Sequence, residues 1–246
     1  MSRGARVLVT ASRPEAVCRL LAARGAVPVA VPTIAIRALS GEPLDGALQR
    51  AEDYDWIVVT SPNGARVVRE RLVALRLSPP SRPRWAVVGP RTRQALAEAG
   101  IAADAEPVAQ IGAAIPDTMG EVDGARVLLL RSTAAANDLP NLLAARGARV
   151  EDVGAYEIVE GPEESRAPLA EAVVEGLDAA IFTSGSTVRG FTRLVDDPKT
   201  ALSGARVVCI GPATARAARE SGLRGIRTAA DRTPAAIVAA VEANGD

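Results

Sequence analysis

The chain of 246 residues contains no histidine. This absence excludes the Ser-His-Asp and Cys-His mechanisms of nucleophilic catalysis and removes the commonest ligand of catalytic zinc. A general acid or base in this protein must therefore be an aspartate, glutamate, lysine, tyrosine or cysteine. Aromatic residues are scarce as well, at 2%, so we expect helix faces lined by alanine and leucine and packed closely.

The usual signatures of nucleotide and metal binding are also missing. No Gly-x-Gly-x-x-Gly segment follows a predicted strand, and no Gly-x-x-x-x-Gly-Lys-Ser/Thr segment occurs. The two cysteines do not form a paired-cysteine spacing of the kind that holds a metal. We therefore expect the protein to act without a cofactor and without a metal.

Cysteine usage, charge and apolar runs bear on the compartment and on the partners. Cys18 and Cys209 lie on predicted regular elements, which indicates buried free thiols and a cytoplasmic protein. No apolar run approaches the roughly 18 residues needed to span a bilayer, and the sequence does not open as a signal peptide does. The 29 basic and 29 acidic residues balance to a net charge of zero, which argues against nucleic-acid binding by a broad positive field.

The most informative feature that is present is an internal duplication. Four segments recur in the same order at an offset of 120 to 123 residues. Chance recurrence of an Ala-, Arg- and Val-rich pentapeptide does occur in this chain, but a collinear series of four blocks is much harder to obtain in that way. Two copies of about 120 residues predict two similar domains with a small-molecule cleft between them. The matched blocks are 4–8 with 124–128, 20–26 with 142–148, 55–61 with 178–184, and 89–92 with 211–214.

Short apolar, β-branched runs alternate with helical stretches along both copies. This alternation is typical of βαβ units with parallel sheets, so the predicted fold class is α/β. Each copy offers five strands, the number of a flavodoxin-like doubly wound sheet, whose ligands bind at the carboxyl ends of the strands. In the first copy we predict strands at 7–9, 27–31, 56–59, 85–88 and 103–106, and helices at 15–24, 44–52, 64–75, 92–99 and 111–119.

The domain boundaries follow from polar, proline-containing stretches at 39–43 and 160–168. These stretches come after predicted strands at 32–36 and 155–159, and they are better places for the chain to cross between domains than the short link at 120–123. One domain would then comprise residues 1–36 and 161–246, and the other residues 37–160. Two contiguous halves remain the alternative.

Small hydroxyl residues and glycines stand where predicted strands end and helices begin. Backbone N–H groups at a helix N-terminus bind anions, so four such ends at the carboxyl edges of the sheets favour a carboxylate- or phosphate-binding site. Ordinary helix capping is the alternative, because serine, threonine and asparagine are the usual caps. The four segments are Thr60-Ser61-Pro62-Asn63, Gly89-Pro90-Arg91-Thr92, Thr183-Ser184-Gly185-Ser186 and Gly211-Pro212-Ala213-Thr214.

The chain has two tyrosines. Tyr54 precedes a predicted strand, and we interpret it as a packing residue. Tyr156 lies at the end of a predicted strand, where a phenol at the mouth of a cleft would serve as a proton donor. A buried tyrosine in the linker between the domains is an equally good interpretation.

In combination these residues resemble the uroporphyrinogen-III synthase family. The shared pattern is a Thr-Ser-x-Asn/Ser segment once per copy, at 60–63 and 183–186, and Gly-x-x-Thr at the next strand end, at 89–92 and 211–214. A Leu-x-x-x-Gly-x-x-Val segment that leads to a tyrosine is matched by 143–156. The likeness covers nearly the whole chain, from Val7 to Val241. Its single motifs are weak, but their order and spacing are fairly specific.

The resemblance implies two α/β domains joined by a two-stranded linker, with the first domain built from both ends of the chain. It implies an enzyme that cyclises hydroxymethylbilane, a linear tetrapyrrole with eight carboxylates, to uroporphyrinogen III while inverting ring D, and that needs no metal or cofactor. Tyr156 is the catalytic residue that the resemblance implies, and it would assist departure of the terminal hydroxyl as water. The strand-end residues would hold substrate carboxylates: Thr60, Ser61, Asn63, Gly89, Thr92, Thr183, Ser184, Ser186, Gly211 and Thr214.

Two segments depart from the family pattern. The segment that begins Arg131-Ser132 keeps the family's first arginine but not the glycines and the second arginine that often follow it. Arg13 comes later than in the usual Thr-Arg-Pro of the family. We include Arg13, Arg131 and Ser132 among the expected substrate contacts. The expected partner is the small-molecule substrate, handled by a monomer that receives it from the preceding pathway enzyme, without nucleic acid or membrane. A non-catalytic module of the same fold that senses a tetrapyrrole or another polyanion is the alternative.

Overall fold

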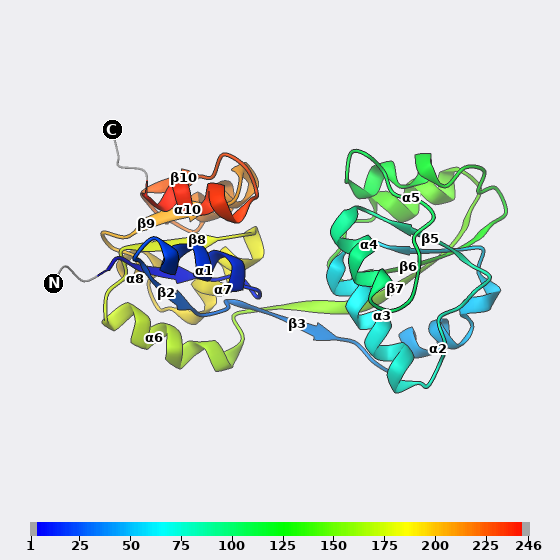
Figure 1. Ribbon diagram of the computed structural model, residues 1–246, viewed down its shortest axis with the longest axis horizontal. Helices are drawn as coiled ribbons and strands as arrows, with labels where there is room; N and C mark the ends of the chain where they lie inside the picture. The colour runs from blue at the N-terminus through cyan, green and yellow to red at the C-terminus, as the bar shows by residue number, and fades with distance from the viewer. Residues whose placement is uncertain (1–3, 243–246) are drawn as a thin grey trace. The chain divides into compact units, whose positions relative to one another are not determined.

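A computed structural model describes residues 4–242 of the chain, which folds into two compact units (Figure 1). Unit 1 is drawn from residues 1–35 and 158–246, and unit 2 comprises residues 36–157. Each unit is an α/β structure around one five-stranded sheet. No helix within residues 4–242 is long and apolar enough to cross a membrane.

The sheet of unit 1 runs in the order β10-β9-β8-β1-β2, and its four neighbouring strand pairs are parallel. Successive side chains of a strand point to opposite faces, so Val7 and Val9 join one core cluster and Leu8 joins the other. Both faces are therefore buried, as parallel sheets require. The strands are β1 (Arg6–Val9), β2 (Val27–Ala30), β8 (Ala179–Phe182), β9 (Arg206–Cys209) and β10 (Ile226–Thr228).

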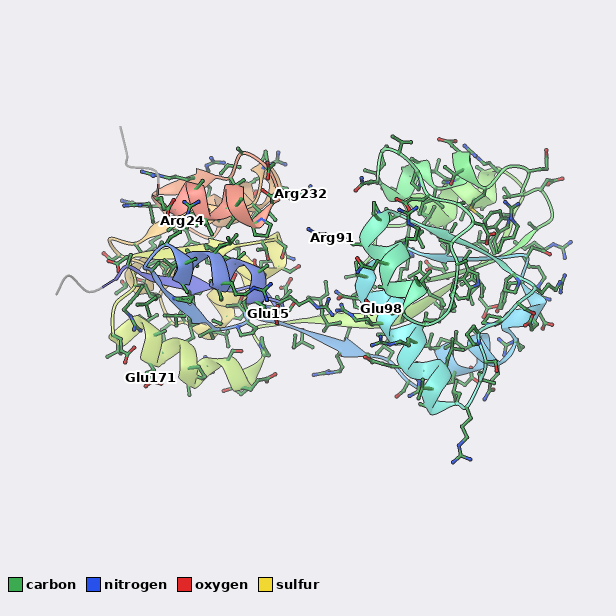
Figure 2. The ribbon with its side chains drawn as sticks, in the orientation of Figure 1. Glu15, Arg24, Arg91, Glu98, Glu171 and Arg232 are labelled. Atoms are coloured by element: carbon green, nitrogen blue, oxygen red, sulfur yellow. The ribbon has the colours of Figure 1, made fainter. Side chains whose placement is uncertain are left out.

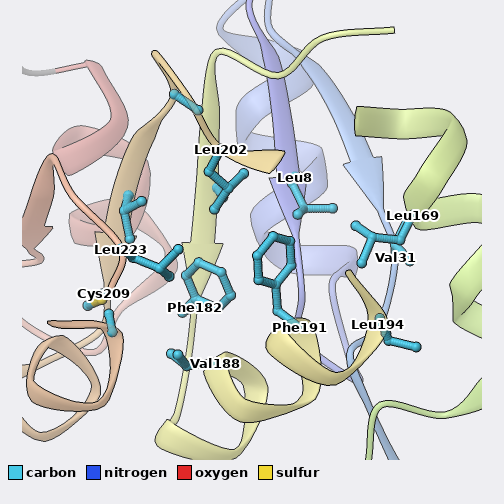
Figure 3. Packing of buried hydrophobic residues seen from close by; sticks show 14 of the residues in the cluster. Leu8, Val31, Leu169, Phe182, Val188, Phe191, Leu194, Leu202, Cys209 and Leu223 are labelled. Atoms are coloured by element: carbon cyan, nitrogen blue, oxygen red, sulfur yellow. The ribbon is translucent and has the colours of Figure 1, made fainter. Parts of the chain in front are cut away.

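Two layers of helices cover this sheet. Helices α1 (Glu15–Ala23) and α10 (Pro234–Glu242) contribute apolar side chains to the core cluster that contains Val7 and Val9. The other face carries Phe182 of β8 against Phe191 of α7, edge to face with ring centroids 5.5 Å apart (Figure 3). Charged side chains such as Glu171 of α6 project outward from the helices (Figure 2). The helices on the second face are α6 (Arg166–Val174), α7 (Gly185–Leu194) and α9 (Pro212–Glu220), with the short η4 (Glu163–Ser165) and α8 (Pro198–Ala201) beside them in the chain.

The sheet of unit 2 runs in the order β3-β7-β6-β4-β5. The pairs β7-β6, β6-β4 and β4-β5 are parallel. Trp56, Val58, Val127 and Leu129 form a core on one face, while α3 packs against α4 and β6. The strands are β3 (Ile34–Ala38), β4 (Trp56–Val59), β5 (Arg84–Val87), β6 (Arg126–Ser132) and β7 (Arg149–Glu160), and the helices are α2 (Leu44–Gln49), α3 (Pro62–Ala74), α4 (Pro90–Ala97), α5 (Asp138–Ala145) and the 3₁₀ turns η1 (Ala51–Asp53), η2 (Gly112–Ala114) and η3 (Pro116–Thr118).

The two units share one strand arrangement, assembled from both copies of the duplication. In unit 1, β2 and β1 come from the first copy and β8, β9 and β10 from the second. In unit 2, β7 and β6 come from the second copy and β4 and β5 from the first, with Ala105 bridged to Ala86 in the fifth position. Unit 1 has the flavodoxin-like order 2-1-3-4-5, and unit 2 has the same spatial arrangement when its strands are counted from β6, so its chain order is circularly permuted. The α/β fold predicted from the sequence, with its duplication, is confirmed.

The chain passes between the units twice, within β3 and within β7, which are neighbours in the sheet order. Arg37 and Glu157 form an ion pair across these strands, 2.7 Å between nitrogen and oxygen. At the unit 1 end, Gly161 N donates to Thr33 O at 2.9 Å. Gly190 also lies against this carbonyl, and a Cβ at Gly190 would come within 1.8 Å of it, so only glycine fits there.

Three predicted elements differ from the structure. The strand predicted at 103–106 is reduced to the single bridge at Ala105. The helix predicted at 111–119 is instead the two 3₁₀ turns η2 and η3, because Pro116 lacks the N–H that would continue the first turn. The strand predicted at 155–159 is the end of the twelve-residue β7.

Candidate functional site

The carboxyl edge of the unit 2 sheet is organised around Ser61. This residue ends β4 and caps α3, because its Oγ accepts a hydrogen bond from Gly64 N at 3.0 Å. Pro62 at the first helical position has no N–H to leave unpaired. Gly64 is buried, and a Cβ there would lie 3.2 Å from Leu130 O, so the first turn of α3 approaches β6 closely.

Tyr156 reaches this edge from β7. Its hydroxyl lies 2.9 Å from Ser61 Oγ, and either oxygen can be the donor. The register between β6 and β7 shifts after Arg131, so that Ser132 pairs with Tyr156 and Ala155 is passed over. Such a bulge re-aims the side chains that follow it. The structure therefore brings together Tyr156, Ser132 and Ser61 from three neighbouring strands, β7, β6 and β4.

The remaining residues of this edge have defined environments. Thr60 is partly buried beside Ser61, and Asn63 accepts a hydrogen bond from Arg66 one turn along α3. Gly89 caps α4 with extended backbone, so its conformation does not itself require glycine. Thr92 is buried in the first turn of α4, with 1% of its surface exposed.

The same edge of unit 1 is built from the second copy. Ser184 caps α7 in a complete capping box: its Oγ accepts from Thr187 N at 3.1 Å, and its own N–H donates to Thr187 Oγ1 at 3.2 Å. Ser186 accepts from Arg189, whose guanidinium is paired with Glu160 at 2.6 Å. These groups satisfy one another within the unit.

The other predicted residues of unit 1 vary in exposure. Thr183 and Gly211 are partly buried at the ends of β8 and β9, and Thr214 is almost fully buried in the first turn of α9. Arg13 is exposed, four residues after β1 ends. The carboxyl ends of β1, β8 and β9 thus collect the predicted residues of this unit at one edge of its sheet.

The Arg131 side chain bonds within its own unit. Its side chain is 5% exposed and makes paired hydrogen bonds to the Asp152 carboxylate of β7, with a third to Ala136 O. The Asp152 hydrogen bonds raise the pKa of Arg131 above its usual range. Arg131 therefore ties β6 to β7, and its role as a carboxylate contact stays a prediction.

Tyr54 provides a contrast to Tyr156. It is 1% exposed, its hydroxyl donates to Glu151 at 2.5 Å, and Arg126 lies over its ring at 5.3 Å from the centroid. Burial first, and the Glu151 carboxylate second, raise the pKa of Tyr54 to about 12. Its predicted packing role is confirmed.

Neither thiol is prepared as a nucleophile. Burial raises the pKa of Cys209 to about 11, and burial with the nearby Glu15 carboxylate raises the pKa of Cys18. Both cysteines are free. Within residues 4–242 no group of three or more acidic or cysteine side chains is placed to hold a metal ion.

Sequence reasoning named Ser61 and Tyr156 separately and missed the bond between them. It also missed the role of Thr187, which completes the capping box of Ser184, and that of Asp152, which binds the Arg131 guanidinium. A signal for the first existed: Thr187 stands three residues after Ser184, the spacing of a capping box. No comparable signal in the sequence pairs Asp152 with Arg131, because that contact depends on the β6–β7 register.

Comparisons with known proteins agree with this architecture. The family model for uroporphyrinogen-III synthase HemD matches residues 15–239. A uroporphyrinogen-III synthase of Synechococcus elongatus is 33% identical over 212 residues, covering 81% of this chain and 79% of that protein. A porphyrin biosynthesis protein HemD of Ruminiclostridium josui is 29% identical over 231 residues, and the match spans 45% of that longer protein.

A solved structure shares the fold. It is a mutant uroporphyrinogen III synthase from the extremely thermophilic bacterium Thermus thermophilus, with a TM-score of 0.63, 23% identity, and coverage of 96% of this chain and 97% of that one. The family match over most of the chain and the relative from Synechococcus elongatus go further than the fold. The chain belongs to the uroporphyrinogen-III synthase family of lyases.

Proposed function

We propose that this chain closes hydroxymethylbilane to uroporphyrinogen III, with Tyr156 as the proton donor to the departing hydroxyl. In that step the carbon–oxygen bond of the terminal hydroxymethyl group breaks, the oxygen takes a proton and leaves as water, and the carbon is freed for ring closure. The observation that carries the proposal is the 2.9 Å contact between Tyr156 and Ser61 at the carboxyl edge of a parallel sheet, where ligands of this fold bind.

The hydrogen-bond pattern around Ser61 favours this direction of proton flow. Ser61 Oγ already accepts from Gly64 N, so its own hydrogen is available to the Tyr156 oxygen. Tyr156 then keeps its hydrogen for a ligand, and the serine donor stabilises the phenolate that develops as the proton leaves. Ser61 is a positioning residue in this scheme.

The substrate carboxylates would be bound by helix N-termini rather than by a field of the whole protein, whose net charge is zero. We propose residues at and near the strand ends as these contacts. Thr92 and Thr214 would act by shaping the first turns of α4 and α9, since both are buried. The proposed contacts are Arg13, Thr60, Ser61, Asn63, Gly89, Ser132, Thr183, Ser184, Ser186 and Gly211.

The decisive experiment is an isomer analysis of the porphyrins formed from hydroxymethylbilane. The substrate closes unaided to the type I isomer, so activity appears as diversion to type III. We expect type III from the wild-type chain and a rate lower by about 10²–10⁴-fold in Tyr156→Phe, the range for a lost general acid. Tyr54→Phe is the matched control and should keep the wild-type rate.

The possible outcomes separate two failures. Only type I from the wild-type chain would overturn the enzymatic proposal and leave the non-catalytic sensing module of the same fold. A full rate in Tyr156→Phe would overturn only the assignment of the acid.

We further propose that the protein acts as a cytoplasmic monomer. The free thiols of Cys18 and Cys209 suit a reducing compartment. Light scattering at micromolar concentration should give the mass of one chain, 25.4 kDa, and a dimer mass would contradict this proposal. Direct transfer of substrate from the preceding enzyme predicts that this enzyme is retained on the immobilised chain, and its passage without retention would contradict direct transfer.

A further inference from the structure

Unit 1 contains a large cavity. Its volume is about 880 Å³, within the usual range for small-molecule sites. The walls are the loop that leads from α8 into β9 and the loop that leads from α9 into β10. Both loops enter strands, so the cavity lies at the amino edge of the sheet, opposite to the edge that carries Ser184 and Gly211.

The lining is charged with one sign. Among the described residues, four cationic side chains contribute to it, Lys199, Arg206, Arg224 and Arg227, and no aspartate or glutamate does. Lys199 and Arg224 are exposed, and the Arg206 guanidinium donates to Val241 O. A cavity lined by one sign of charge over apolar walls focuses its field and concentrates counter-ions.

The nearest acid in sequence lies outside the lining, and its pKa is lowered most by the hydrogen bond from the Thr200 hydroxyl and least by attraction to Lys199. Asp197 precedes the lining, and its carboxylate accepts from Lys199 N and Thr200 Oγ1 at the start of α8. The apolar part of the lining comes from Leu202, Leu223 and Ile226. The lining thus combines cationic side chains with apolar ones.

The duplication supplies an internal control. Unit 2 has a cavity at the equivalent place, before β5 and before the Ala105 bridge, but it measures only about 270 Å³. Where unit 1 has Arg224 and Arg227, unit 2 has Ala102 and Ala105, at the same offset of 122 residues. The fold alone therefore does not produce the cationic lining.

The charges of the unit 2 cavity are balanced. Asp104 lines it and accepts from Trp85 N at 2.7 Å. Arg82 bonds to Glu52 O and pairs with Asp55, and Arg84 stacks over the Trp56 ring at 4.1 Å. A cationic lining without an acid is a property of the second copy's cavity and not of its counterpart.

We propose that the cavity of unit 1 is a second binding site, which takes a small molecule with several phosphate or carboxylate groups. Arginine and lysine are the side chains that bind such groups by charge-assisted hydrogen bonds. The positive φ of Gly204, Gly222 and Gly225 lets the backbone turn at the rim without a Cβ. This site is independent of the chemistry assigned to Tyr156.

Binding is measured by amide NMR of the full chain with two probes, inorganic tripolyphosphate and benzene-1,2,4,5-tetracarboxylate. Gly204, Gly222 and Gly225 line the cavity, so their amide signals are the reporters. Saturable shifts of these signals with tripolyphosphate identify a phosphate ligand, and shifts with the tetracarboxylate identify a carboxylate ligand. If neither probe gives saturable shifts at low salt, the proposal is overturned.

The test of the residues is the double variant Lys199→Gln/Arg224→Gln. Removing two exposed cations should weaken binding by about tenfold, and the remaining affinity should fall further as salt is raised. Arg19→Gln/Arg216→Gln removes two exposed cations of unit 1 that do not line the cavity and should bind as the wild type does. An equal loss in both double variants would show unspecific attraction to unit 1 and overturn the site. Tyr156→Phe should bind both probes unchanged.

Discussion

Ser61 of unit 2 and Ser184 of unit 1 occupy the same position in two copies of one fold, but their hydroxyls bond differently. Ser184 is enclosed in a capping box with Thr187, which satisfies the helix end locally. In unit 2 the third helical position is Gly64, which has no hydroxyl to reciprocate, and Ser61 bonds to Tyr156 instead. Within its own unit Ser184 thus bonds only to its helix end, whereas Ser61 is also connected to a phenol that can do chemistry.

The largest expected difference between the copies is in catalysis. Ser61→Ala should lower the rate of type III formation by about 10–100-fold, the loss of one hydrogen bond to a developing phenolate at about 1.5–3 kcal/mol. Ser184→Ala should lower it by no more than about tenfold, since this variant loses the cap and one proposed substrate contact of about 0.5–1.5 kcal/mol but no bond to Tyr156. Initial rates with isomer analysis measure both. Equal losses in the two variants would contradict the comparison.

The next effect is on stability, and it is expected in unit 1 instead of unit 2. Thr187→Val keeps the shape of the side chain and removes the reciprocal half of the capping box, so it should lower the free energy of unfolding by about 1–2 kcal/mol. The catalytic rate should remain that of the wild type. Urea unfolding with a parallel rate assay checks both, and Ser186→Ala, which removes only an exposed bond to Arg189, is the control. Unchanged stability of Thr187→Val would mean that the box contributes nothing.

A smaller effect distinguishes the two tyrosines of unit 2. The folded state raises the pKa of Tyr54 from an unfolded value of 10.0 to about 12, so above pH 10 the folded chain binds more protons than the unfolded chain. Its contribution to stability is complete below pH 10 and is lost as the pH rises toward 12. Tyr54→Phe should therefore flatten the alkaline fall in stability. Thermal melts from pH 9 to 12 measure this, and an identical pH dependence in the variant would contradict it.

The last prediction is that removal of metal ions has no effect on activity. Neither strand edge of the two units contains a group of side chains suited to a metal ion among the described residues. A chelator should therefore leave both the rate and the isomer ratio unchanged. Loss of activity that zinc or magnesium restores would show that the described edges do not contain the whole site.

The class of fold followed from the sequence because periodic apolar runs report burial directly. Val7 to Val9 alternate between two cores, and Trp56 and Val58 share one core. The break at Pro116 could have been predicted from the missing N–H of proline, whereas the single bridge at Ala105 depends on pairing that local propensity does not reveal.

The places of the candidate residues in the fold could be predicted, but their contacts could not. Parallel topology places strand ends at one edge, so Ser61, Ser132 and Tyr156 could be listed together. Their bonding depends on the bulge after Arg131, a register detail that one sequence does not encode in any recognisable pattern. The same register brings Arg131 to Asp152.

The exchange of strands between the two copies sets the order in which the chain can fold during synthesis. Unit 2 is one continuous segment, complete once residue 157 has been made. Strand β1 can pair with β2 early, yet its other partner β8 begins only at Ala179. Pairing so distant in sequence closes slowly, and unpaired strand edges invite aggregation in the interval. The edge of β1 that binds β8 thus stays open until after the whole of unit 2 has been synthesised.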